Sequence, residues 1–94
     1  MEILNYRDVI DKPNVIGEFD VYLPDEKITV YNCQVIRSKS GKIFPTWPKY
    51  GKKIADKWQF WPVITFMVEK QKLYDDSMKR LIDEILNTKD PAAF

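Results

Sequence analysis

Basic and aromatic side chains are concentrated in one part of this 94-residue sequence, residues 37–61. Residues 37–57 carry seven basic side chains and one acidic side chain, a net charge of +6, whereas the rest of the chain carries −5. The stretch also holds six large aromatic residues, including all three tryptophans: Phe44, Trp47, Tyr50, Trp58, Phe60 and Trp61. Basic groups attract phosphates and aromatic rings stack on unpaired bases, so this combination is typical of a surface that binds a nucleic-acid strand.

Ten residues of this stretch are the candidate nucleic-acid contacts. The basic residues would hold phosphates, and the aromatic residues that flank the turns and the loop would stack on bases. The candidates are Arg37, Lys39, Lys42, Trp47, Lys49, Tyr50, Lys52, Lys53, Lys57 and Trp58. Phe44 and Phe60 are instead expected in the core, because large aromatic side chains usually fill the interior of so small a domain. A single strand is favoured as the ligand, because binding of a duplex would leave the stacking aromatic residues without a role.

The same residues allow other interpretations. Exposed tryptophan and tyrosine are also typical of protein interfaces, so the aromatic strand and the loop 48–57 could form a protein-interaction or inhibitor module. A lysine-rich loop can also serve solubility alone. For a nucleic-acid partner, the sequence does not distinguish DNA from RNA.

The residue types that the chain lacks argue against catalysis and metal binding. The absence of histidine removes the commonest general base and metal ligand. The single cysteine, Cys33, excludes an intramolecular disulfide and a cysteine-based zinc site, and it is expected to be a small buried residue. The glycines form no phosphate-binding motif. We therefore expect a protein that is not an enzyme and has no cofactor, bound metal or small-molecule substrate.

Composition favours one globular domain over residues 1–94. Hydrophobic residues make up 45% of the chain and aromatic residues 14%, which is typical of a folded protein. No apolar run approaches the roughly 18–20 residues that span a bilayer, and the first residues do not resemble a secretory signal. We expect a cytoplasmic protein with no membrane partner. A chain this short gains stability from association, which favours a homodimer.

The hydrophobic pattern predicts an α+β fold, with an antiparallel four- to five-stranded meander followed by one helix on one face of the sheet. The predicted strands cover residues 2–10, 15–23, 27–37, 42–47 and 58–68. Residues 48–57 are predicted to form a loop, long and basic enough to be functional. The spacing of the apolar residues near the C-terminus predicts a helix over 75–87, and residues 88–94 are expected to form a frayed tail.

Two local irregularities are expected in the third strand and its hairpin. Val30 and Cys33 lie on opposite faces of a regular strand, so a β-bulge or sharp twist is predicted near Tyr31 and Asn32. Gly41 lies in the polar loop that follows and is expected to adopt a positive φ.

The middle of the chain resembles a known family. The features that carry the likeness are the strand 28–36, the hairpin 40–44 with its glycine and phenylalanine, Pro48 and Lys49, the segment 54–56, Pro62 and the closing helix. Over about residues 15–86 this order is similar to stage V sporulation protein G (SpoVG) and its relatives. The resemblance implies a SpoVG-like domain that dimerises by sheet extension and binds nucleic acid in a regulatory role. The layout also resembles single-strand-binding transcriptional coactivators of the positive-cofactor type, which is an analogy of arrangement.

Overall fold

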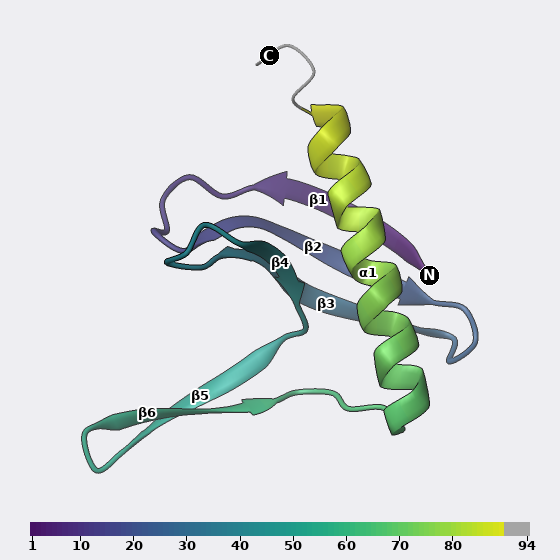
Figure 1. Ribbon diagram of the computed structural model, residues 1–94. Helices are drawn as coiled ribbons and strands as arrows, with labels where there is room; N and C mark the ends of the chain where they lie inside the picture. Colours follow the sequence, from purple (N-terminus) through teal and green to yellow (C-terminus); the bar gives the residue numbers. More distant parts are fainter. Residues whose placement is uncertain (90–94) are drawn as a thin grey trace.

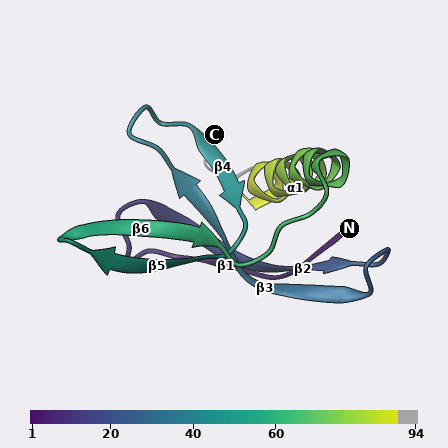
Figure 2. The same ribbon diagram turned by 90° about the horizontal axis from the view of Figure 1, so that it is seen from below.

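One helix lies across a four-stranded antiparallel sheet, and a separate two-stranded sheet projects from its edge (Figures 1 and 2). The computed structural model describes residues 1–89. Its elements are β1 (Glu2–Asp8), β2 (Val15–Leu23), β3 (Ile28–Arg37), β4 (Ile43–Thr46), β5 (Lys49–Ile54), β6 (Lys57–Pro62) and α1 (Val68–Lys89). The first sheet follows chain order, β1-β2-β3-β4, and the second pairs β5 with β6. The predicted α+β class and antiparallel meander are confirmed.

The core lies between α1 and the inner face of the first sheet. Alternate residues of β2 and β3 meet three residues of α1 that are four positions apart and therefore share one helix face. The buried hydrophobic side chains are Phe19, Val21, Leu23, Val30, Cys33, Val35, Tyr74, Met78 and Ile82. Cys33 is fully buried as predicted. Its burial raises the pKa of the thiol to about 12, and the nearby charge of Asp20 contributes a smaller part of this increase. The thiol is therefore protonated and unreactive in the folded protein.

Asp20 of β2 lies between two β-bulges, one in β3 and one in β1. Tyr31 and Asn32 of β3 share the position opposite Asp20, and Asn32 has a φ of 65°. The register of β1 shifts beside Asn5, whose φ is 55°. The Asp20 carboxylate is only 6% exposed and accepts hydrogen bonds from the Asn32 backbone N–H (3.1 Å) and from Asn5 Nδ2 (3.0 Å). The bulge predicted near Tyr31 and Asn32 is confirmed, and it leaves the Tyr31 ring exposed.

The helix begins earlier than the apolar pattern predicts. It starts at Val68 rather than at residue 75, and its first turns leave Val68 and Leu73 exposed. Consequently the predicted strand 58–68 is wrong beyond Pro62, where residues 63–67 link β6 to α1 without regular structure. The predicted tail is also wrong at residues 88 and 89, which are helical; residues 90–94 lie outside the described part of the chain.

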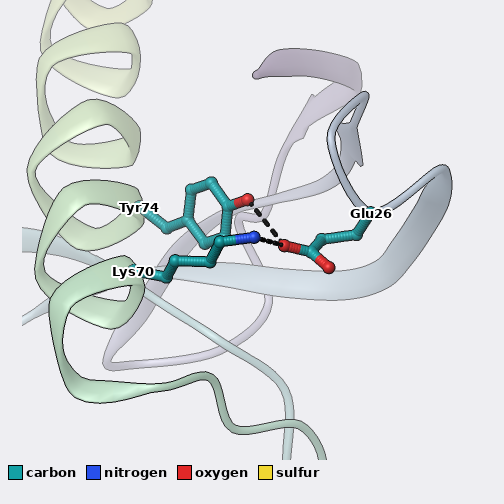
Figure 3. Close-up of polar contacts among 3 residues, drawn as sticks. All are labelled: Glu26, Lys70 and Tyr74. Atoms are coloured by element: carbon teal, nitrogen blue, oxygen red, sulfur yellow. Dashed lines mark hydrogen bonds and ion pairs between the residues drawn. The ribbon is translucent and has the colours of Figure 1, made fainter.

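A polar contact fixes the early turns of α1 to the β2–β3 connection (Figure 3). Glu26 Oε1 accepts hydrogen bonds from Lys70 Nζ at 2.6 Å and from the Tyr74 hydroxyl at 3.1 Å. These bonds, chiefly the one from Lys70, lower the pKa of Glu26 below its ordinary value of 4.5, and the same contact raises the pKa of Lys70. The contact therefore anchors the early turns of the helix beside the core residue Tyr74.

Replacing Glu26 with glutamine is expected to remove part of the acid sensitivity of folding. As the pH falls through 4.5, the unfolded chain takes up the proton before the folded protein does. The stabilisation by Glu26 is thus complete above its unfolded pKa and is lost as the pH falls toward its lower folded pKa. Urea unfolding should show Glu26→Gln to be less stable than the wild type at neutral pH and nearly equal in acid. A gap that stays constant in acid would contradict this role for the carboxylate.

Residues 48–57 were predicted to be a loop, but all of them except Pro48 belong to a hairpin that we call the arm (residues 49–62, β5 and β6). Its strands are joined by the two-residue turn Ala55-Asp56, with φ values of 50° and 65°, as a type I′ turn requires. The Val63 N–H donates to the Pro48 carbonyl at 3.1 Å and closes the base of the arm. The radius of gyration, 14.4 Å, exceeds the roughly 12 Å of a compact chain of this length because the arm projects (Figure 1).

No helix within residues 1–89 is long and apolar enough to cross a membrane.

Candidate nucleic-acid interface

The register of the arm divides its side chains between two faces. Residues directly opposite each other in an antiparallel pair lie on the same face, and neighbours along a strand alternate. One face, which we call the Trp58 face, carries Lys49, Gly51, Lys53, Trp58, Phe60 and Pro62. The other, the Tyr50 face, carries Tyr50, Lys52, Ile54, Lys57, Gln59 and Trp61. Each face therefore combines two aromatic rings with two lysines.

The two rings of the Trp58 face form an exposed platform. Trp58 and Phe60 stack with their centroids 6.3 Å apart and their planes at 20°, and they are 64% and 63% exposed. The Phe60 ring lies over Gly51, because a Cβ on that glycine would be 2.7 Å from Phe60 Cε1. The expectation that Phe60 belongs to the core is therefore wrong. Its neighbour across the hairpin is Gly51, which has no side chain. The ring therefore lies against the backbone of the arm and stays outside the core.

The Tyr50 face offers less free ring surface. Tyr50 and Trp61 stack on each other across the strands at 5.5 Å and 23°, so each ring covers part of the other. Tyr50 remains 55% exposed, and Trp61 is partly buried. Of the three aromatic candidates, Tyr50 and Trp58 are exposed and Trp47 is partly buried, and only Trp58 has its stacking partner beside it on the same strand.

A groove of about 890 Å³ continues from the Trp58 face along the outer side of β3 and β4. Gln34 and Ile36 of β3 pair with Thr46 and Phe44 of β4, and these positions alternate with the buried residues that face α1. Phe60 and Lys49 line the groove from the arm, and no acidic side chain of the described residues lines it. The expectation that Phe44 belongs to the core is also wrong, because it lies in the groove wall and is 38% exposed.

Trp47 connects the arm to the helix. Its Nε1 donates to Asp75 Oδ1 at 2.6 Å, and its ring meets Phe66 edge to face at 5.3 Å. Gln71 Nε2 donates to the same Asp75 oxygen at 2.9 Å. The structure therefore places this candidate at the foot of the arm, partly buried and engaged on two sides. Its evident contribution is to fix where the arm leaves the sheet.

The basic candidates divide into two groups. Lys49, Lys52, Lys53 and Lys57 lie on the arm, where Asp56 in the turn is the single acidic residue. The other three, Arg37, Lys39 and Lys42, lie at the loop end of the β3–β4 hairpin, which Figure 2 shows diverging from the arm. The structure thus does not unite all seven charges. Ion pairs between residues 1–89 involve lysines of α1, which leaves the arm lysines unneutralised.

Sequence reasoning missed four residues that share this surface with the candidates: Tyr31, Gln34, Phe44 and Phe60. The position of Phe60, two residues from Trp58 on the same strand, could have indicated a shared face. Gln34 gave no signal, since only the strand pairing brings it beside Thr46 and Phe44.

Within the described part of the chain, no three acidic or cysteine side chains cluster in a way that could hold a metal ion. Comparison with protein-family models, with curated proteins and with solved structures finds no match to this chain.

Proposed function

We propose that this protein binds single-stranded DNA or RNA through the Trp58 face of the arm and the groove that continues from it. One observation carries the proposal: two stacked rings, each more than 60% exposed, lie on the same face as Lys49 and Lys53. Exposed rings accept unpaired bases, and lysines beside them accept the phosphates between those bases. The role is non-catalytic and suits a cytoplasmic regulatory protein.

A single strand fits this surface better than a duplex does. The rings of Trp58 and Phe60 are exposed and do not pack in the core, so they are free to stack on a ligand. Only unpaired bases present free faces for such stacking. A duplex reader that inserted the arm as a β-ribbon would use the lysines and leave the rings unused. Equal affinity for matched single and double strands would therefore count against the proposal.

The contribution of the lysines is expected to depend on the face that they occupy. Lys52 and Lys53 are neighbours in β5 on opposite faces, so they form a matched pair. Each phosphate contact of a single strand contributes about 0.7 to the slope of log affinity against log salt. Lys53→Ala should flatten this slope by about that amount, and Lys52→Ala should flatten it less. Lys12→Ala, in the connection between β1 and β2 and outside the arm, should leave it unchanged.

Fluorescence titration of an oligonucleotide at several salt concentrations measures these slopes. Absence of binding at low salt would refute the proposed function. Binding of a protein partner that survives nuclease treatment, without quenching of tryptophan fluorescence by poly(dT), would instead favour a protein-interaction module. Membership of a SpoVG-like family and a homodimeric state stay predictions, and sedimentation equilibrium tests the second.

A further inference from the structure

The groove differs chemically from the aromatic platform beside it. Trp58 and Phe60 offer ring faces, and stacking on a ring face accepts every base with little discrimination. The groove adds polar groups that can form directional hydrogen bonds: Thr29, Asn32, Gln34 and Thr46. Sequence-specific recognition of single strands uses such groups to contact the edges of unstacked bases.

Gln34 is the best placed of these polar residues. It lies in the middle of β3, between the aromatic wall at Phe44 and the bulge at Asn32, and it is partly buried. Its backbone carbonyl accepts the Thr46 hydroxyl at 3.5 Å, whereas its side-chain amide has no hydrogen bond to any residue in 1–89. A glutamine amide offers one acceptor and two donor hydrogens, which suits the edge of a nucleobase.

The charges around the groove favour an anionic strand. Among residues 1–89, Lys49 is the only charged residue that lines it, and it lies on the same arm face as Phe60. A strand whose bases stack on Trp58 and Phe60 would therefore pass Lys49 as it enters the groove. The volume, about 890 Å³, is within the range of roughly 300–1,000 Å³ that is typical of small-molecule sites, and it exceeds what one base needs.

We propose that the groove seats one unstacked base of the bound strand, with its edge hydrogen-bonded by the Gln34 amide and its phosphate held by Lys49. This inference rests on the proposed function. It assigns the two halves of the site different tasks: the arm binds any strand, and the groove selects the base.

The test compares matched homo-oligonucleotides of A, C and T by fluorescence anisotropy. The wild type should prefer its best oligonucleotide over its worst by about fivefold, the size expected from one or two hydrogen bonds to a neutral group. Gln34→Met removes the amide and keeps the side-chain length, so it should reduce the preference to less than about twofold. Gln59→Met makes the same chemical change on the Tyr50 face and should keep the wild-type preference.

A second measurement uses the wild-type protein alone and does not depend on how a variant folds. A single abasic site is moved along the best oligonucleotide, and one position should weaken binding clearly more than its neighbours. Failure of the wild type to bind any oligonucleotide would refute the proposed function and this inference together. Binding with a preference that Gln34→Met leaves intact, or with equal losses at every abasic position, would overturn the inference and leave the proposed function standing.

Discussion

Replacing both Trp58 and Phe60 with alanine is expected to weaken oligonucleotide binding by at least about 30-fold. Stacking is worth about 1–3 kcal/mol per base, and the two rings together offer the largest free aromatic surface of the arm. Neither ring packs in the core, so the unfolding transition of the sheet and helix should change little. Anisotropy titration of the double variant and of each single variant measures the loss.

The control for this experiment is Tyr50→Ala. Tyr50 also belongs to the arm, but it lies on the opposite face with part of its ring against Trp61. Its replacement should weaken binding less than either single replacement on the Trp58 face. If Tyr50→Ala were the more damaging change, the strand would follow the other face of the arm and the groove would not belong to the site.

Asp20→Ala is expected to lower the free energy of unfolding by about 3 kcal/mol. The carboxylate accepts two hydrogen bonds in a nearly solvent-free position, and bonds to a charged group contribute about 1.5–3 kcal/mol each. Alanine would leave the Asn32 N–H without its acceptor and both bulges without their common partner. Urea unfolding followed by circular dichroism measures the change.

Asp20→Asn is the matched variant, since it keeps the shape of the side chain and one oxygen that can accept from the Asn32 N–H. It should cost clearly less than Asp20→Ala. Equal losses in the two variants would assign the effect to the charge, and an unchanged stability in Asp20→Ala would show that the bulges form without this carboxylate.

The sheet and the core helix face could be predicted because their hydrophobic periods are regular. The alternation in residues 15–23 and the change of face between Val30 and Cys33 predicted both a strand and its bulge. The start of the helix could not be predicted in this way. Its first turns are held by Glu26, which is 44 positions from Lys70, and long-range polar contacts leave no local pattern.

Strand β5 and the turn that joins it to β6 escaped prediction because neither shows the sequence signal of a hairpin, whereas most of β6 falls within the predicted strand 58–68. Residues 49–54 are exposed at every position, so they show no alternation of apolar and polar residues. The turn Ala55-Asp56 lacks the glycine or asparagine that usually marks a type I′ turn. The predicted stretch of the chain does carry exposed aromatic rings and lysines, but which of its aromatic residues are exposed depends on the register of β5 with β6 and on Gly51 beneath Phe60.

The arm contributes no side chain to the core and has its own small sheet. Substitutions in the arm are consequently expected to change what its surface contacts and to have little effect on the folding of the domain. If the arm binds as proposed, ligand preference can therefore diverge quickly between descendants of this chain while the scaffold stays fixed. The body, where Asp20 ties β1, β2 and β3 together, has no such freedom.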